Sequence, residues 1–313
     1  MPTIPSHLHK GDKVAIAATA RKISPAEIEP TVRLLQEWGL EVIVPEGLFE
    51  EYGQLAGTDD HRANLMQHLL DDDEVRAIFC ARGGYGTVRM IDQLDWTRFQ
   101  TSPKWIVGYS DVTVLHSHIH NLLDISTLHA TMPINITWDD VATWQKNTAL
   151  ASLHQFLFVG SLKLSLEAET TYRNCNQIHL EGEIVGGNLS ILYSLSGTPS
   201  DIDTRDKILL IEDLDEYLYH VDRMMQNLKR SGKLRDIKAL IVGAMSDMHD
   251  NSTPFGMDVR EIILDAVRDY RYPVIFTNDI GHVGLQNAAI PLGHPCSIHS
   301  DNTKNIVLEF TQF

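Results

Sequence analysis

Several features by which whole classes of protein are recognised are missing from this sequence of 313 residues. No apolar run reaches the length of about 18 residues that a transmembrane helix needs, so we expect no membrane span. The segment from Met1 to Gly11 has no apolar core of the kind found in secretory signals. Together these absences predict a protein of the cytoplasm.

Cysteine is scarce, and its placement excludes the usual cysteine-based frameworks. The three cysteines, Cys80, Cys175 and Cys296, lie far apart and show no C-x-x-C spacing. This pattern predicts reduced, buried thiols in a reducing compartment, rather than disulfides or a zinc site. A catalytic cysteine is the alternative that the sequence leaves open.

Basic residues are outnumbered by acidic ones. The chain has 26 Lys and Arg residues against 42 Asp and Glu residues, and its formal net charge is −16. Sequence-independent binding to nucleic acid or to anionic membranes needs clustered Lys and Arg. We therefore expect no nucleic-acid partner and no membrane partner, although a local positive pocket is compatible with this composition.

Short apolar runs alternate with amphipathic segments of helical length. In the first half, we expect strands at Lys13–Ala18, Glu41–Val44, Val75–Cys80 and Trp105–Val107. The helices expected between and after them are Pro25–Trp38, Asp59–Leu70, Thr87–Leu94 and Asp111–Leu122. This alternation predicts an α/β fold, with a mostly parallel sheet that is covered by helices on both faces.

The length of the chain favours two domains. We place them at residues 1–165 and 178–313, joined by the polar stretch Glu167–Asn176 and preceded by a helix at Ala142–Leu157. The second half again alternates. Its expected strands are Gly182–Val185, Lys207–Ile211, Ala239–Val242 and Val274–Thr277, with one or two closing strands in Ser297–Phe310. Its expected helices are Asn188–Ser196, Glu216–Ser231 and Asp258–Asp269.

The first candidate site follows the expected strand Trp105–Val107. The residues Gly108-Tyr109-Ser110-Asp111 lead from this strand into a helix. Such a turn is typical of a nucleophile elbow, which exposes a serine hydroxyl beside the N–H groups of a helix amino end. The motif departs from G-x-S-x-G because Val112 occupies the second glycine position. Ser110 as a simple helix N-cap is the alternative.

The second candidate is the glycine-rich run Arg82-Gly83-Gly84-Tyr85-Gly86, which follows the expected strand Val75–Cys80. Three glycines in four positions allow the backbone to approach a ligand closely. The run does not fit G-x-G-x-x-G, since Arg89 falls at the last glycine position, and it lacks the Lys-Ser/Thr of a phosphate-binding loop. We expect a loop that donates backbone N–H groups, or a plain tight turn, in preference to a nucleotide-phosphate site.

The third candidate has two parts, which also follow strands. Glu212 comes directly after the apolar run Lys207–Ile211, and His282 lies in a glycine-flanked loop after Val274–Thr277. Ligands of parallel sheets bind at the carboxyl ends of the strands. Ser110, Glu212 and His282 therefore supply the nucleophile, the orienting carboxylate and the general base of an acyl-transfer triad.

Three other carboxylates lie close to Glu212 in the sequence. Since side chains alternate along a strand, Asp213 is expected to point away from Glu212. Asp215 and Glu216 are expected at the start of the next helix, where N-capping and the helix dipole account for a carboxylate. We therefore assign the triad carboxylate to Glu212.

A metal site is the weaker hypothesis. His116, His118 and His120 lie on one expected helix, and His116 and His120 are neighbours on its surface. The sequence has no H-E-x-x-H motif, and no nearby carboxylate completes a ligand set. A solvated or helix-packing row of histidines explains them more simply.

Taken together, these motifs resemble the LD-carboxypeptidase family. These serine peptidases include muramoyl-tetrapeptide carboxypeptidases and microcin C immunity peptidases. The resemblance extends from Gly11 to about Gly293 and depends on the order and spacing of several motifs. They are Arg82–Gly86, Gly108–Asp111, Gly186-Gly187-Asn188-Leu189, Glu212, and Gly281-His282 followed by Ile290–Gly293.

The resemblance implies a fold, a mechanism and a partner. The first domain would be a flavodoxin-like, or amidotransferase-like, α/β domain that carries the nucleophile, and the second a swivelling β/β/α domain. Ser110, Glu212 and His282 would form the catalytic triad, and the backbone N–H groups of Gly84 and Asp111 would form the oxyanion hole. No metal or organic cofactor would be needed, and the protein would form a homodimer.

The implied reaction is the release of terminal D-Ala from a murein tetrapeptide stem, by cleavage of an L,D-peptide bond during peptidoglycan recycling. A microcin C-type immunity peptidase, which cleaves an aminoacyl-nucleotide amide, is the alternative within the family. A non-catalytic module that binds a nucleotide or a sugar phosphate is the alternative of another class.

Overall fold

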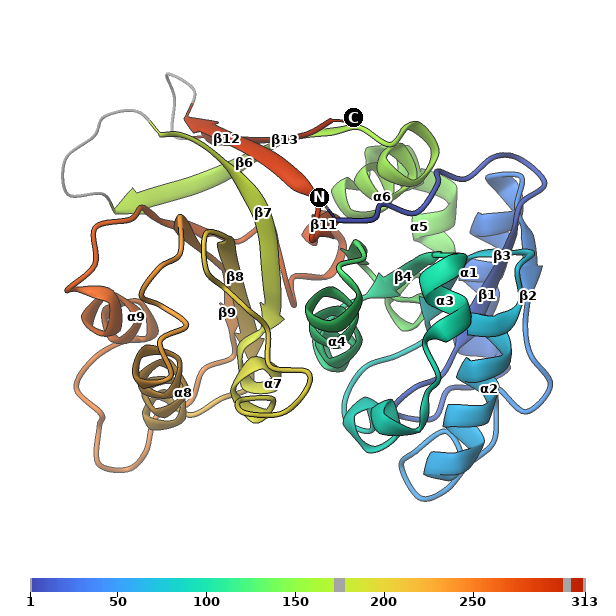
Figure 1. The fold of residues 1–313 in the computed structure, drawn as a ribbon, viewed down its shortest axis with the longest axis horizontal. Coiled ribbons are helices and arrows are strands. Elements are labelled where there is room, and N and C mark those ends of the chain that lie inside the picture. The colour runs from blue at the N-terminus through green and yellow to red at the C-terminus, as the bar shows by residue number, and fades with distance from the viewer. Residues whose placement is uncertain (1, 172–177, 301–304, 312–313) are drawn as a thin grey trace.

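The structure is a computed structural model that describes all residues except 1, 172–177, 301–304 and 312–313. Two strand assemblies lie side by side (Figure 1). An open sheet flanked by helices, mostly in blue and green, occupies one half of the molecule, and a closed barrel occupies the other. Helix α4 (Thr113–Leu123) lies at the centre of the molecule and contacts the barrel.

The open sheet has the strand order β11-β5-β4-β3-β1-β2. Its strands are β1 (Lys13–Ala17), β2 (Glu41–Ile43), β3 (Val75–Cys80), β4 (Trp105–Gly108), β5 (Thr127–His129) and β11 (Ile290–Leu292). The first five are parallel, and β11 is antiparallel to β5. The order 2-1-3-4-5 of the parallel strands is that of flavodoxin-like folds, so the expected parallel sheet and fold class are confirmed.

The helices around the open sheet bury their apolar faces against its strands. They are α1 (Pro25–Glu37), α2 (Asp59–Asp71), α3 (Thr97–Thr101), α4, α5 (Trp138–Thr143) and α6 (Thr148–Val159). The central strand β4 is buried along its whole length, as expected of a parallel strand that is covered on both faces. The direction of the parallel strands brings the carboxyl ends of β1, β3 and β4 to one edge.

The barrel has the closed strand order β10-β6-β13-β12-β7-β8-β9. Its strands are β6 (Leu162–Thr171), β7 (His179–Asn188), β8 (Ile208–Leu214), β9 (Ala239–Ser246), β10 (Val274–Thr277), β12 (Pro295–Ser300) and β13 (Asn305–Phe310). Strands β7 to β10 are parallel neighbours. Helices α7 (Leu189–Ser194), α8 (Leu218–Arg230) and α9 (Val259–Val267) accompany them.

Three of the differences between the expected elements and the structure lie before residue 180. Thr87–Leu94 forms two short 3₁₀ turns, Thr87–Arg89 and Ile91–Gln93, instead of one α-helix. The expected helix Ala142–Leu157 is interrupted, because the side chain of Asn147 accepts a hydrogen bond from the N–H of Leu150 and begins a new helix there.

The third difference concerns the polar stretch Glu167–Asn176, which was expected to be a connection. Its residues 167–171 continue strand β6, so that expectation was wrong for them. The buried residues of β6, from Leu162 to Ala168, alternate with exposed ones, which is the period-2 pattern of a strand with one solvated face. Residues 172–177 lie outside the described part of the chain. The expected domain end at residue 165 falls within β6.

The two halves approach each other through glycines of β7. A Cβ added to Gly187 would lie 2.6 Å from Oγ1 of Thr113 on α4. The same hydroxyl accepts a hydrogen bond from the N–H of Asn188 at 3.0 Å. Since only glycine allows this approach, the Gly-Gly-Asn motif accounts for the docking of α4 on the barrel.

Candidate active site

The chain turns sharply at Ser110, directly after β4. Ser110 has a φ of +63°, which is unusual and strained for a residue with a Cβ. A 3₁₀ turn, Ser110–Val112, follows it and leads into α4. A simple N-cap would have an extended backbone. The strained strand-turn-helix geometry therefore favours the nucleophile elbow over the N-cap.

The glycine-rich loop after β3 packs directly on this turn. A Cβ added to Gly83 would lie 3.0 Å from Cβ and 3.1 Å from Oγ of Ser110. Gly84 has a φ of +105° and lies against the side chain of Arg21. Glycines are therefore required here for close approach and for backbone conformation. Gly84 and Asp111, the two expected oxyanion-hole residues, line the same cleft as Ser110.

The side chain of Asp111 has a structural contact rather than a catalytic one. It is buried, and its Oδ2 accepts a hydrogen bond from the backbone N–H of Thr87 at 2.9 Å. Burial raises the pKa of this carboxyl group above its usual range. The contact ties the turn at Ser110 to the end of the glycine-rich loop.

Glu212 and His282 form a hydrogen-bonded pair. Glu212 is fully buried near the end of β8, and its Oε2 accepts a hydrogen bond from Nδ1 of His282 at 2.6 Å. Gly281 has a φ of +106°, and a Cβ there would lie 2.8 Å from the same oxygen. The glycine before His282 therefore makes room for the carboxylate. Because Nδ1 is engaged, Nε2 is the ring nitrogen available to a nucleophile.

The imidazole of His282 lies beside the Ser110 turn. Its ring centroid is 4.8 Å from that of Tyr109, and His282 and Ser110 line one cleft of about 490 Å³. Within the described residues, no hydrogen bond joins Ser110 to His282. Such catalytic contacts are often long without substrate and shorten when it binds. The structure thus brings Ser110 and His282 to one cleft, and the buried Glu212 already contacts the imidazole of His282.

His129, which the sequence analysis missed, is a second partner of Glu212. It is the last residue of β5, and its Nε2 lies 3.9 Å from Oε1 of Glu212. Burial alone raises the pKa of Glu212, but the two imidazoles together hold this pKa at about 2. The available signal was a histidine at the carboxyl end of a strand, but Thr127–His129 was not identified as a strand.

The acidic neighbours of Glu212 have other partners. As expected, Asp213 points to the opposite side, where it accepts hydrogen bonds from Nδ2 of Asn188 and N–H of Ser190, both at 2.9 Å. Burial and the charge of Glu212 raise the pKa of Asp213 to about 7.

The expectation that Asp215 and Glu216 begin the next helix was wrong, since α8 begins at Leu218. Asp215 instead contacts Nε2 of His249 at 2.6 Å, and Glu216 contacts Nδ1 of His220 at 2.6 Å. Both carboxylates therefore belong to the loop between β8 and α8, and each is held by a histidine.

The histidines of α4 do not converge on a common point. Nε2 of His116 contacts the carbonyl of Gly108 at 2.9 Å, and Nδ1 of His118 contacts Oγ of Ser200 at 2.9 Å. All three are buried, so they are packing residues rather than a solvated row. His120 lies near Asp124 and Glu183.

Two further observations bear on cations and thiols. The ammonium group of Lys207 binds Glu183 beside His120, so a positive charge already occupies that cluster. Cys80 and Cys296 are buried and free, whereas Cys175 lies outside the described residues. Burial raises the pKa of the Cys80 thiol to about 12, which makes it a poor nucleophile.

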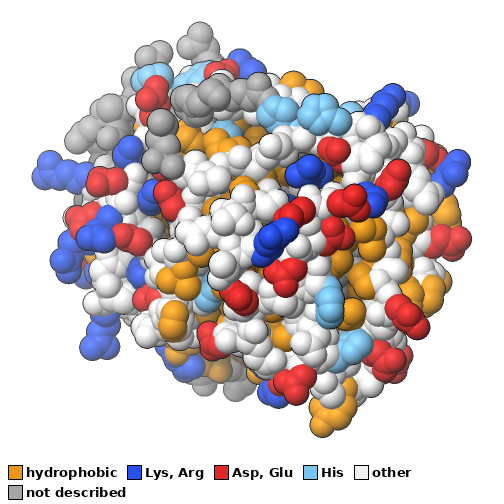
Figure 2. Space-filling model, turned by 45° about the vertical axis from the view of Figure 1, so that its right-hand side comes forward, with side chains coloured by type: hydrophobic (Ala, Val, Ile, Leu, Met, Phe, Trp, Pro, Cys, Tyr) orange, Lys and Arg blue, Asp and Glu red, His pale blue; other side chains and the backbone are white. Residues whose placement is uncertain are grey.

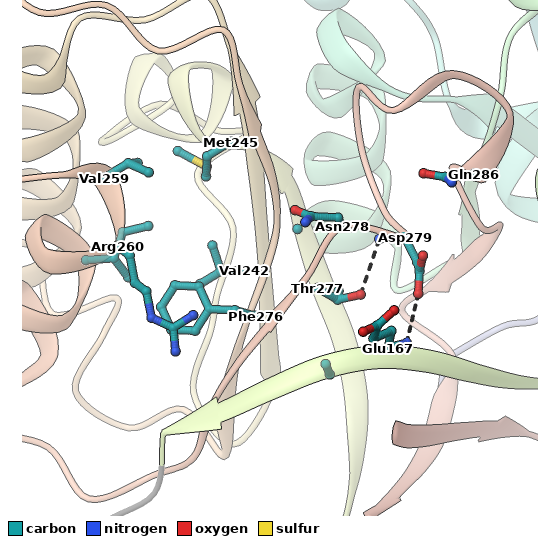
Figure 3. Close-up of a pocket in the computed structure, with 13 residues that line it drawn as sticks. Glu167, Val242, Met245, Val259, Arg260, Phe276, Thr277, Asn278, Asp279 and Gln286 are labelled. Carbon is teal, nitrogen blue, oxygen red and sulfur yellow. Dashed lines mark hydrogen bonds between the residues drawn. The ribbon is translucent and has the colours of Figure 1, made fainter. Parts of the chain in front are cut away.

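A second cavity, of about 440 Å³, lies between β9, β10 and α9 (Figure 3). Its lining includes Arg260, whose guanidinium lies 4.2 Å from the ring centroid of Phe276. Oδ2 of Asp279 accepts a hydrogen bond from the backbone N–H of Glu167 at 2.9 Å. This contact fastens the start of the loop that carries His282 to strand β6. None of the three expected triad residues lines this cavity.

The family comparisons agree with this geometry. A model described as the LD-carboxypeptidase N-terminal domain matches residues 14–130, and one described as the C-terminal domain matches residues 181–298. The chain belongs to the LD-carboxypeptidase family. It is 35% identical to a probable murein peptide carboxypeptidase of Bacillus subtilis, over 97% of this chain and 94% of that protein. It is 28% identical to a murein tetrapeptide carboxypeptidase of Pseudomonas aeruginosa, over 90% and 91%.

Solved structures share the two-part fold of this LD-carboxypeptidase family member. A muramoyltetrapeptide carboxypeptidase from Oxalobacter formigenes superposes with a TM-score of 0.82 at 23% identity, covering 96% of this chain and 99% of that chain. The structure of MccF in complex with glutamyl sulfamoyl guanosine has a TM-score of 0.85 at 19% identity, covering 100% and 99%. The family membership expected from the motifs is therefore confirmed, and the chain is a peptidase.

Two observations concern membrane spans and surface charge. No helix in the described ranges is both long and apolar enough to cross a membrane. On the face shown in Figure 2, acidic and basic side chains are interspersed.

Proposed function

We propose that this protein is a serine carboxypeptidase that hydrolyses the L,D-peptide bond of a murein tetrapeptide and releases terminal D-Ala. The observation that supports this most directly is the 2.6 Å contact between Glu212 and His282, across the cleft from the strained turn at Ser110. The names of the relatives in Bacillus subtilis and Pseudomonas aeruginosa point to the same substrate class.

In the proposed mechanism, Ser110 is the nucleophile. Nε2 of His282 accepts the hydroxyl proton while Oγ of Ser110 attacks the scissile carbonyl. Glu212 keeps the proton on Nδ1 of His282 and stabilises the imidazolium that forms. Since Glu212 is fully buried and its pKa is low, it stays ionised through this step.

The oxyanion is assigned to the backbone N–H groups of Gly84 and Asp111. The close contact of the glycine-rich loop with Ser110 supports this assignment, because it brings fixed donors to the nucleophile. His282 then gives its proton to the leaving amine of D-Ala. In the second half of the reaction, a water molecule attacks the acyl-enzyme while His282 takes its proton, and His282 then returns the proton to Oγ of Ser110.

The test is incubation of the purified protein with a murein tetrapeptide, followed by an assay of released D-Ala. We expect release by the wild type. Ser110→Ala should reduce kcat by about 10⁶, as removal of a serine nucleophile does in a well-studied protease, while the thermal unfolding midpoint stays close to that of the wild type. More than a tenth of wild-type turnover in Ser110→Ala would exclude this triad.

An aminoacyl-nucleotide amide is the second substrate to include in the assay. Structures of MccF complexes share the fold, but at identities too low to transfer a substrate. Cleavage of the nucleotide amide without release of D-Ala would favour the immunity-peptidase alternative. Nucleotide binding in a thermal-shift assay with no hydrolysis of either substrate would favour the non-catalytic module.

We further propose that residues 1–165 and 178–313 act as two domains, the first supplying Ser110 and the second Glu212 and His282. A homodimer acting in the cytoplasm on peptides released from the cell wall completes this proposal. Sedimentation analysis of the purified protein tests the dimer. No cofactor is part of the proposed reaction, because a serine mechanism needs none.

A further inference from the structure

The cleft beside Ser110 carries opposite charges on its two walls. Asp215 and Glu216 lie on the wall formed by the loop after β8. Arg21 and Arg82 lie on the wall formed by the loops after β1 and β3. These two loops flank the point at which the strand order of the open sheet reverses, where ligands of such sheets bind.

The two arginines differ in their partners. Nη1 of Arg82 donates a hydrogen bond to the carbonyl of Lys22 at 3.4 Å and lies 3.7 Å from a carboxylate oxygen of Glu27. The exposed side chain of Arg21 makes no hydrogen bond and no ion pair with any residue of the described ranges. Arg21 is therefore the guanidinium of this cleft that is available to an anionic ligand.

Arg21 is also held in a defined place. The backbone on either side of it is tied to residues 54–56, since the N–H of Lys22 donates to the carbonyl of Gln54 and the N–H of Ala56 donates to that of Ala20, both at 3.0 Å. The Arg21 side chain lies over Gly84, where an added Cβ would be 2.6 Å from Cδ and 2.7 Å from Nε. It therefore lies next to the proposed oxyanion hole.

We propose that Arg21 binds the free carboxylate at the C-terminus of the peptide and so makes the enzyme a carboxypeptidase. This inference rests on the proposed function. A carboxypeptidase must distinguish a charged chain end from an internal peptide group, and a guanidinium does so through two parallel hydrogen bonds to a carboxylate. In this arrangement, the leaving D-amino acid lies on the Arg21 side of Ser110, and the acidic wall faces the rest of the substrate.

The experiment compares two substrates that differ only in the charge of the chain end. They are the tetrapeptide with a free C-terminal carboxylate and the same tetrapeptide with a C-terminal carboxamide. We expect the wild type to prefer the free acid. Arg21→Gln should lower kcat/KM for the acid by roughly 10- to 100-fold, the range of a charge-assisted hydrogen bond, and leave kcat/KM for the amide nearly unchanged.

Two further variants separate the role of the guanidinium from general effects. Arg21→Lys keeps the charge but loses the two-pronged geometry, so its preference for the acid should be intermediate. Lys22→Gln removes a positive charge from the same loop, but the Lys22 ammonium pairs with Glu51, so its substrate preference should equal that of the wild type.

Three results would overturn the inference. If Arg21→Gln keeps the wild-type preference for the acid, Arg21 does not bind the carboxylate, although the peptidase function stands. An equal loss of preference in Lys22→Gln would show a nonspecific charge effect. If the wild type releases D-amino acid from neither substrate, the proposed function itself fails, and this inference fails with it.

Discussion

Nε2 of His129 lies 3.9 Å from Oε1 of Glu212, and both side chains are fully buried. Within the described residues, neither ring nitrogen of His129 has a hydrogen-bond partner, and neither has Oε1 of Glu212. The imidazole of His129 is nevertheless a polar group that faces Oε1, and its attraction helps to lower the pKa of Glu212. Glu212 is thus held between two imidazoles, one on each half of the molecule.

We expect His129→Leu to destabilise the protein by about 1–3 kcal/mol near neutral pH, because it removes the polar group that faces a buried carboxylate oxygen. The pKa of Glu212 lies at about 2 in the folded protein, against 4.5 as its ordinary value, so the pair contributes stability above pH 4.5 that is lost as the pH falls towards 2. In His129→Leu this pH-dependent part should shrink.

Denaturant unfolding over that pH range measures both effects. His129→Gln is the matched control, since its side-chain amide keeps a polar donor facing Glu212. It should recover part of the stability that His129→Leu loses. Equal stability of the wild type and His129→Leu at neutral pH would show that this contact contributes nothing.

Glu212→Gln should lower kcat by about 10³–10⁴, by analogy with other triad carboxylates. The neutral amide has no negative charge to stabilise the imidazolium, and its NH2 group can donate to Nδ1 of His282 and so favour the wrong tautomer. Asp215→Asn tests the competing carboxylate in the loop after β8, whose side chain contacts His249 and not His282, so we expect little change in kcat, and any effect on substrate binding would appear in KM. Steady-state kinetics with the tetrapeptide measure kcat for both variants. If kcat falls little in Glu212→Gln but strongly in Asp215→Asn, the triad carboxylate is misassigned.

Activity should survive prolonged treatment with a metal chelator. Lys207 already pairs with Glu183 in the cluster around His120, and the histidines of α4 have separate packing contacts. We therefore expect the rate of D-Ala release to be the same before and after chelation and dialysis. A loss of activity that added zinc restores would require a metal site instead.

Much of the fold could be predicted from the sequence because strands that are buried on both faces are continuous apolar runs. The strand β3 and the strand β10 begin and end where the sequence predicted. Strand β6 was missed because its exposed face is polar, so the stretch has the composition of a loop although its buried positions alternate. Strand β11 was missed because three residues are too few to show a period.

The candidate site could be assembled from the sequence because its members follow strands. The rule that ligands bind at strand carboxyl ends selected Ser110, Glu212 and His282 from distant segments. His129 and Arg21 escaped the same rule for different reasons. His129 is the last residue of β5, a strand of only three residues that was not identified. The role of Arg21 became apparent only because the neighbouring Arg82 has partners of its own.

The last prediction concerns Asp213, whose burial near Glu212 raises its pKa from 3.8 to about 7. The folded state therefore holds a proton on Asp213 between these values that the unfolded state has lost. Stability from this group is greatest below about pH 4 and falls as the pH rises through 7. Three donors, from Asn188, Ser190 and Leu214, face the two oxygens of Asp213. Asp213→Asn removes the titration but costs at least one hydrogen bond, since the amide nitrogen that replaces one oxygen cannot accept.

Urea unfolding at about pH 4 and at about pH 8 tests this sign, which follows from the linkage between proton binding and stability. At the lower pH, Asp213→Asn should be less stable than the wild type. As the pH rises, the difference should shrink or reverse by up to a few kcal/mol, because only the wild type then carries a poorly solvated charge. The exposed Asp60→Asn should keep the same difference from the wild type at both values. If the disadvantage of Asp213→Asn instead grows with pH, then the ionised Asp213 stabilises the fold, and the hydrogen bonds from Asn188 and Ser190 outweigh its burial.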